Sequence, residues 1–211
     1  TLRLCDFCVC GTLDDIRWLK RRYPSAQNKI RYVPNGVDIP AQPAWLSAAP
    51  RPNNFLFVGQ DSWRKNIDYA LKLFVEIKGR ISGAQFMVVG TGSSTLQRYP
   101  AFCELQSCIT HVPRESLEGM FHWYRTCPYL IFTSRYEGGH PLTVLEAMAQ
   151  GMVVFTVGIG AITELVHDRV NGLLLEGENA GHDAGRITRG IENTESIHRM
   201  SRTASTTAMR N

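Results

Sequence analysis

The feature that most constrains the fold of this chain is the alternation of short apolar runs with amphipathic stretches. The runs are apolar at consecutive positions rather than at every second one, which is typical of strands covered on both faces. They occupy residues 30–33, 54–59, 85–90, 107–112, 129–133, 152–158 and 172–176. The alternation predicts an α/β fold, a Rossmann-like parallel sheet with helices on both faces.

Two of the intervening stretches have apolar residues at helical spacing. One stripe consists of Ile67, Ala70, Leu71, Phe74, Ile77 and Ile81, and the other of Leu117, Met120, Phe121 and Tyr124. In such sheets the ligand site lies at the carboxyl ends of the strands, where the connecting loops gather. We therefore expect the loops that carry Gly59, Gly90–Gly92, Gly138–Gly139 and Gly158–Gly160 to line one rim.

Composition divides the 211 residues into three parts. Residues 1–28 carry a strand-like and a helical pattern ahead of a Pro- and Asn-rich passage, and we interpret them as the remnant of a preceding domain. Residues 29–180 form the sheet domain. Residues 181–211 are rich in Gly, Ser and Thr and predict a helical or flexible tail. Because the chain begins at Thr1 rather than Met, we expect a processed or excised piece of a longer protein.

Charge and cysteine usage narrow the functional class. Hydrophobic content of 44% and charged content of 20% are typical of soluble globular proteins. The net charge of +4 is scattered, without the basic stripe of a nucleic-acid binder, so no nucleic acid is predicted as a partner. Peripheral contact with anionic lipid stays open. Cys5, Cys8 and Cys10 lie on an apolar, strand-like stretch, while Cys103, Cys108 and Cys127 are dispersed without the paired CxxC spacing of a zinc site. We therefore predict a protein with reduced cysteines, located in the cytoplasm or at the membrane periphery.

Residues 129–151 indicate a phosphate site. They read as a buried strand, a glycine-bearing turn and a helix with Pro141 in its first turn. The first amides of a helix lack internal partners and attract anions. Glu146 lies five residues beyond Pro141, about 7 Å along the axis, and its two oxygens suit neighbouring hydroxyls. Together with Glu137 on the same rim, this predicts a nucleoside diphosphate; a capped surface helix with two solvated glutamates is the alternative.

Several motifs carry a resemblance to a known family. They are VPNGVD at 33–38, FVG at 57–59 followed by Lys65 and Asn66, VVGTG at 88–92, ITHVPRESL at 109–117, residues 137–151, and GIGAITELVHDRVNGLLL at 158–175. In this order they resemble the donor-binding C-terminal half of the retaining glycosyltransferases of family 4, which have the GT-B architecture. The resemblance covers about residues 1–180, and residues 1–22 resemble the last strand and helix of the N-terminal half.

The resemblance implies binding of a nucleoside-diphosphate sugar and transfer of the sugar with retention of configuration. The acceptor, a carbohydrate or a lipid-linked molecule, would be held by an N-terminal half, and the nucleotide sugar would be a substrate, with no cofactor. Lys65 matches the family lysine on the diphosphate, and Glu137 matches a glutamate near the donor sugar. These two are the implied catalytic residues.

The implied donor-binding residues surround them. Glu146 matches the glutamate on the ribose, the backbone from Gly139 to Thr143 would hold the distal phosphate, and residues 111–114 fall where relatives meet the nucleobase. The full implied set is Gly59, Gln60, Arg64, Lys65, Gly138, Gly139, His140, Leu142, Thr143, Glu146, His111 and Val112. His140 is either a turn residue or a donor contact.

The chain departs from the family pattern in three places. Gln60 stands where relatives have an arginine, and Arg64 is the candidate substitute. Eight residues rather than the usual seven separate Glu137 from Glu146, and we expect the extra one in the turn at 138–141, which leaves Glu146 as the firmer match. No aspartate pair has the DxD spacing, so no metal is predicted.

Two other functions are weighed against this one. A non-catalytic nucleotide-sugar-binding module or regulatory subunit would accommodate Gln60 and the longer glutamate spacing. A sugar-nucleotide epimerase of similar shape is disfavoured by the paired-glutamate segment.

Overall fold

The computed structural model describes residues 4–47 and 51–211. The main body is built on a six-stranded sheet in which every neighbouring pair is parallel, in the order β5-β4-β3-β6-β7-β8. The strands are β3 (Asn54–Val58), β4 (Gln85–Val89), β5 (Ile109–Val112), β6 (Tyr129–Phe132), β7 (Val153–Val157) and β8 (Gly172–Leu175). The predicted α/β fold with a parallel sheet is confirmed.

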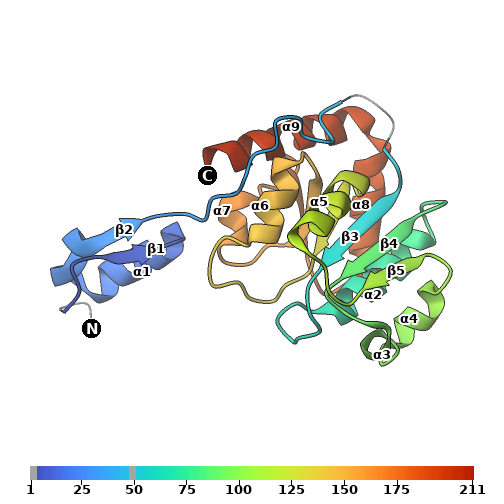
Figure 1. Cartoon of the computed structure of the whole chain (residues 1–211), viewed down its shortest axis with the longest axis horizontal. Coiled ribbons are helices and arrows are strands. Elements are labelled where there is room, and N and C mark those ends of the chain that lie inside the picture. The colour runs from blue at the N-terminus through green and yellow to red at the C-terminus, as the bar shows by residue number, and fades with distance from the viewer. Residues whose placement is uncertain (1–3, 48–50) are drawn as a thin grey trace.

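Helices cover both faces of this sheet (Figure 1). One face packs against α2 (Ile67–Lys78), α4 (Pro100–Leu105) and α8 (Ala180–Glu192). The other packs against α5 (Leu117–Thr126), α6 (Leu142–Ala149) and α7 (Ile162–Leu165). A short helix, α3 (Ser93–Leu96), follows β4, and the chain closes with α9 (Thr194–Arg210), which contributes side chains to both apolar clusters.

The parallel register stacks large side chains across the sheet. Phe55 lies opposite Tyr129, with ring centroids 5.1 Å apart, and the Tyr129 ring lies 5.6 Å from that of Phe155. These three rings share one face, and the alternating neighbours Leu56 and Leu130 point to the other. Both faces are therefore apolar, which explains why the strands are hydrophobic at consecutive positions.

The two predicted helical stripes differ in burial. In α2 the residues Ile67, Ala70, Leu71, Phe74 and Ile77 are all buried, as predicted. In α5 only Tyr124 is buried, and Leu117 at the start of the helix remains 66% exposed. The exposed end of α5 borders a pocket described below.

The N-terminal residues form a small separate unit beside the main body (Figure 1). It consists of β1 (Cys8–Cys10), α1 (Leu13–Arg22), a 3-10 helix (Pro24–Lys29) and β2 (Ile30–Tyr32). β1 and β2 pair in parallel with Cys8 opposite Ile30. The prediction that residues 30–33 belong to the main sheet is therefore wrong: they complete the sheet of the N-terminal unit.

The linker from residue 33 onward is tied to both units. Val33 N donates to Cys10 O at 3.0 Å, and Asn35 Nδ2 donates to His140 O at 2.8 Å. Further along, Trp45 N donates to Gln150 O at 3.0 Å, so the linker follows α6 across the surface of the main body. Figure 1 shows this path as the blue segment that passes from the N-terminal unit toward β3.

Residues 181–211, expected as a helical or flexible tail, form most of α8 and all of α9. The inner face of α9 includes the small buried residues Ser201, Ala204, Ser205 and Ala208. The helix packs closely against α6, and Ser205 Oγ donates to Ala149 O at 3.4 Å.

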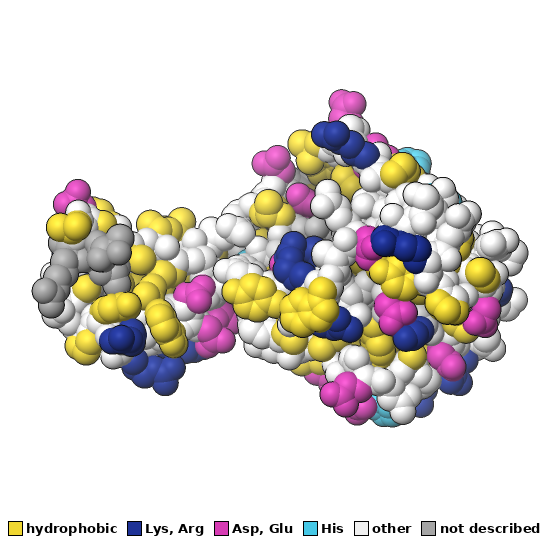
Figure 2. Space-filling model, turned by 90° about the horizontal axis from the view of Figure 1, so that it is seen from below, with side chains coloured by type: hydrophobic (Ala, Val, Ile, Leu, Met, Phe, Trp, Pro, Cys, Tyr) yellow, Lys and Arg dark blue, Asp and Glu magenta, His cyan; other side chains and the backbone are white. Residues whose placement is uncertain are grey.

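Apolar side chains are exposed on the N-terminal unit, and Figure 2 shows them gathered there. Phe7, Val9 and Trp18 are 61%, 62% and 55% exposed. Within residues 4–47 and 51–211, no helix combines the length and apolar character needed to cross a bilayer.

Candidate functional site

Two cationic side chains meet one carboxylate at the carboxyl ends of the neighbouring strands β3 and β6. Lys65 Nζ lies 2.7 Å from Glu137 Oε1, and Arg64 Nη1 lies 2.6 Å from Glu137 Oε2. Both cations come from the loop between β3 and α2, while Glu137 comes from the loop between β6 and α6. The two loops meet because adjacent parallel strands end at the same edge of the sheet.

The surroundings of Lys65 fix its position. Its ammonium lies 4.8 Å from the centre of the Phe132 ring, and Thr133 Oγ1 donates to the Lys65 carbonyl at 3.1 Å. A Cβ on Gly59 would lie only 3.1 Å from Lys65 Cγ, so glycine leaves room for the lysine stem. The Lys65 and Glu137 side chains are 15% and 9% exposed, which strengthens their attraction relative to that of a surface pair.

The N-terminus of α6 lies just beyond this cluster in the chain. Pro141 is the N-cap, and its carbonyl accepts from Val144 N and Leu145 N at 3.1 Å. The amides of Leu142 and Thr143 precede the first helical hydrogen bond, so they have no partner within the helix. Amides in this position can donate to an anion.

Glu146 lies in the next turn of α6. Its Oε2 accepts a hydrogen bond of 2.6 Å from the Tyr124 hydroxyl of α5. Burial raises the pKa of Tyr124, and the negative charge of Glu146 raises it further, so the phenol stays protonated and donates. This leaves Oε1 of Glu146 to accept from another group.

Glu146 also lines a pocket of about 440 Å³ between α5, α6 and the linker. Its remaining walls are Gly36, Val37, Asp38, Leu117, Phe121, Leu142 and Gln150. Leu142 and Glu146 therefore share one cavity, whose other walls include the exposed end of α5. Apolar side chains beside the carboxylates of Glu146 and Asp38 suit a nucleoside, which has an apolar base face and polar hydroxyls.

His140 contacts the carboxylate of Glu164 rather than that of Glu146. The residue is 3% exposed, and its Nε2 lies 3.3 Å from Glu164 Oε2, on α7. Its Nδ1 is buried with no hydrogen-bond partner among the described residues. The ring contact with Glu164 and the hydrogen bond from Asn35 to its carbonyl both hold His140 in the turn before α6.

Other residues of the predicted set lie further apart. His111 and Val112 end β5, which is separated from β3 by β4, and the His111 ring lies 6.1 Å from that of Phe102. Gln60 and Gly138 are exposed at the same edge of the sheet. A Cβ on Gly139 would meet nothing within 4 Å, so the backbone there is open to a ligand.

Two residues of the site were not among the site residues predicted from the sequence. Tyr124 is predicted as part of an apolar stripe, and nothing in that pattern indicates that its hydroxyl reaches Glu146. Glu164 lies inside the matched segment at 158–175, which marked its region but not its role. Arg64, the candidate substitute for the missing arginine, does point toward the carboxylate that Lys65 contacts.

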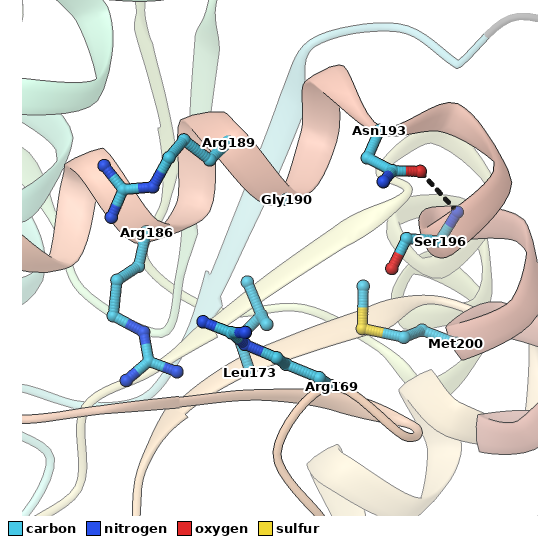
Figure 3. Close-up of a pocket in the computed structure, with 8 residues that line it drawn as sticks. All are labelled: Arg169, Leu173, Arg186, Arg189, Gly190, Asn193, Ser196 and Met200. Carbon is cyan, nitrogen blue, oxygen red and sulfur yellow. Dashed lines mark hydrogen bonds between the residues drawn. The ribbon is translucent and has the colours of Figure 1, made fainter.

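Two further clusters include none of the residues described so far. A cavity of about 270 Å³ between β8, α8 and α9 is shown in Figure 3, with Arg169, Arg186 and Arg189 beside it. Arg186 is already paired with Asp168, at 2.8 and 2.9 Å. Among the residues that the structure describes, Glu176, His182 and Asp183 bring ligand atoms within 4.8 Å of one another.

Asp183 in that second cluster already has a structural role. Its oxygens accept from Tyr69 Oη at 2.6 Å and from the amides of Glu176 and Gly177 at 3.0 Å. These hydrogen bonds join α2 and α8 to the end of β8.

Comparison with known proteins places the chain in a family. Residues 38–207 match the family model of group 1 glycosyl transferases. The D-inositol 3-phosphate glycosyltransferase of Nocardia farcinica is 26% identical over 92% of this chain and 47% of its own length. That of Acidothermus cellulolyticus is 27% identical over 89% of this chain and 46% of its own length. The chain thus spans about half the length of these relatives.

Solved structures agree with the fold. A variant of S. aureus TarM, in complex with UDP and carbohydrate ligands, has a TM-score of 0.83 at 17% identity and covers all of this chain and 42% of its own. Anabaena HepE in complex with UDP-glucose has a TM-score of 0.75 at 17% identity, over 99% of this chain and 60% of its own. Because the family model matches most of the sequence, the chain belongs to the group 1 glycosyl transferases.

Proposed function

We propose that this chain binds a nucleoside-diphosphate sugar and, together with an acceptor-binding half, supports transfer of a hexose with retention of configuration. The nucleotide sugar is the donor substrate, and the reaction uses no further cofactor or metal. The observation that carries the proposal is the convergence of Arg64 and Lys65 on Glu137, next to the N-terminus of α6.

Charge supports a pyrophosphate at this place. Arg64 and Lys65 carry two positive charges, and Glu137 carries one negative charge. The N-terminus of α6 adds about half a positive charge. Together these charges offset most, but not all, of the negative charge on the diphosphate of a nucleotide sugar. When the bond to the sugar breaks, negative charge grows on the distal phosphate, and fixed cations stabilise that charge most.

The remaining residues contact different parts of the donor. Glu146, with Oε1 available, accepts from the ribose hydroxyls, and the walls of its pocket contact the nucleoside. The amides of Leu142 and Thr143 donate to the distal phosphate. Glu137 then lies between the phosphates and the sugar, where it orients Lys65 and contacts the sugar.

The acceptor is held outside the described fold. The apolar side chains on the N-terminal unit, including Phe7 and Val9, would be covered by an N-terminal half of the kind that the longer relatives have room for. Because several relatives are named for D-inositol 3-phosphate, this cyclitol phosphate is the first acceptor to test, followed by lipid-linked sugars.

Calorimetric titration tests the donor site. We expect the chain to bind UDP with one site and to bind UMP more weakly, since UMP lacks the distal phosphate. Lys65→Ala should lower the affinity for UDP at least tenfold and leave UMP binding nearly unchanged. Lys78→Ala is the matched control, because Lys78 lies in the last turn of α2 and bonds to Glu104 O, away from the rim.

GDP is titrated in parallel to identify the base. Uridine is tested first because solved relatives of the same fold contain UDP. Failure of both diphosphates to bind, or equal loss of UDP and UMP affinity in Lys65→Ala, would contradict the proposed site.

A further inference from the structure

Glu164 connects the N-terminal unit to the loop that carries the candidate donor site. Its Oε2 accepts from Leu13 N and its Oε1 from Asp14 N, both at 2.9 Å. These amides are the first two of α1 and have no partner within that helix. A carboxylate at a helix N-terminus is also stabilised by the helix dipole. Glu164 therefore holds the start of α1 from the opposite unit.

The same carboxylate holds His140. Oε2, the oxygen that accepts from Leu13 N, also lies 3.3 Å from His140 Nε2. The His140 and Glu164 side chains are 2% and 11% exposed, so water competes little for this contact. α7, which carries Glu164, lies on the side of the main body nearest to the N-terminal unit (Figure 1).

His140 in turn belongs to the loop between β6 and α6. Glu137, the partner of Lys65, lies three residues before it, and α6 begins two residues after it. The carbonyl of His140 is fixed as well, by Asn35 Nδ2 of the linker at 2.8 Å. The ring of His140 is therefore held by a carboxylate that also contacts α1, and its backbone by a residue of the linker that follows the N-terminal unit.

We propose that Glu164 is a positioning residue that couples the docking of α1 to the shape of the donor loop at residues 137–142. When α1 is docked, the carboxylate holds His140, and the loop keeps Glu137 beside Lys65. When α1 leaves, Oε2 loses a donor and His140 is free to turn. The consequence for sugar transfer rests on the function proposed above. Coupling of this kind is reciprocal, so donor binding would also favour the docked position of α1.

A simpler role for Glu164 would be to cap α1 and nothing more. The two roles differ in one respect. If Glu164 is only a cap, a change confined to the first turn of α1 does not reach His140; if it couples the two sites, the change does.

The test removes one donor of α1 without breaking the helix. Leu13→Pro deletes the amide that bonds to Glu164 Oε2, and proline is well tolerated at the first position of a helix. The preceding residue, Thr12, is already extended at φ −133° and ψ 153°, as proline requires. Leu13→Ala is the matched control, because it loses the side chain but keeps the amide.

The readout is the imidazole ¹⁵N signals of His140 in the 211-residue chain, identified by their absence in His140→Gln. We expect Leu13→Pro to shift these signals toward their position in Glu164→Ala, and Leu13→Ala to leave them where the wild type has them. Unchanged signals in Leu13→Pro, in a chain that keeps the wild-type helical content, would overturn the coupling.

Amide exchange gives an independent measurement that needs no change in α1. In Glu164→Ala, exchange should accelerate at least tenfold at Leu13 and Asp14 but not at Asp15, whose amide bonds to Thr12 Oγ1 at 3.1 Å. Unchanged exchange at Leu13 and Asp14 would show that Glu164 does not hold α1, and the inference would fail.

Addition of UDP separates this inference from the proposed function. In the wild type, saturating UDP should slow exchange at Leu13 and Asp14 at least threefold, and in Glu164→Ala it should not. If UDP binds and slows nothing, the coupling is wrong while the donor site stands. If UDP does not bind, the donor site is wrong, and the ligand-free signals of His140 still decide whether Glu164 couples α1 to the loop.

Discussion

The Tyr124 hydroxyl donates a 2.6 Å hydrogen bond to Glu146 Oε2. The phenol ring is buried in the apolar cluster between the sheet and the helices α5, α6 and α7, so it cannot follow the carboxylate if the carboxylate moves. Glu146 is therefore held in one orientation before any ligand arrives, with one oxygen free. An acceptor fixed in this way can distinguish a hydroxyl that is present from one that is missing.

This orientation leads to a prediction about ribose. We expect the chain to bind UDP about tenfold or more tightly than 2′-deoxy-UDP, since a hydrogen bond to a charged group contributes about 1.5–3 kcal/mol. Glu146→Ala should abolish most of that preference, and Tyr124→Phe should reduce it. Calorimetry with the two nucleotides measures both effects. If Glu146→Ala keeps the full preference, Glu146 does not contact the ribose.

Turnover should depend on Lys65. At about 4 Å and an effective dielectric of about 20, one unit charge is worth up to about 4 kcal/mol. In an enzyme that includes the acceptor half, Lys65→Ala should lower kcat/KM on the order of a hundredfold or more, measured with labelled nucleotide sugar. Lys78→Ala should leave it unchanged. A loss below threefold in Lys65→Ala would remove Lys65 from the donor site.

The rim of the sheet should be sensitive to a methyl group at Gly90. Its φ is +101°, and a Cβ there would lie 2.8 Å from Gly59 O. Strain and overlap with fixed backbone should lower the free energy of unfolding by about 2–4 kcal/mol in Gly90→Ala. Gly83→Ala isolates the backbone effect, because Gly83 has φ +71° but nothing within 4 Å of its Cβ position. Urea unfolding curves compare the two variants, and equal losses would contradict the predicted overlap.

Cys127 should resist alkylation. Burial raises the pKa of its thiol to about 12 from the usual 9.0. At pH 8 we therefore expect iodoacetamide to label the exposed Cys103 and not Cys127, as read by mass spectrometry of the folded chain. Labelling of Cys127 should appear when the chain is unfolded in urea. Equal labelling of the two thiols in the folded chain would show that Cys127 is accessible.

The same shift makes stability depend on pH. Between pH 9 and pH 12 the unfolded thiol loses its proton while the folded one keeps it, so the unfolded state binds fewer protons and stability falls as pH rises. The decline in the free energy of unfolding over this range should be smaller in Cys127→Ser, which has no group that titrates there. An identical decline in both chains would assign it to other groups.

The strands of the main body were predictable because each is buried on both faces. Runs such as residues 54–59 and 129–133 leave little choice of structure, and the order of strands and helices then requires a parallel sheet. The short run at 30–33 has the same local pattern. Its pairing with β1 depends on the path of the linker, which local sequence does not encode.

The C-terminal helices were harder to foresee for another reason. A helix that packs closely on a neighbour uses small residues, and Ser201, Ala204 and Ser205 carry no hydrophobic periodicity that a sequence pattern can show. At the candidate site the motifs indicated Lys65, Glu137 and Glu146. They could not indicate Tyr124 or Glu164, whose roles come from contacts between elements distant in the chain.

The linker also determines how the two units can move. Val33 bonds back to Cys10 in the N-terminal unit, and Asn35 bonds forward to His140 in the main body. Only Pro34 lies between these two anchors, and its ring fixes one of its two backbone torsions. Reorientation of the small unit relative to the main body therefore requires either rotation of the backbone close to Pro34 or the loss of one of these two hydrogen bonds.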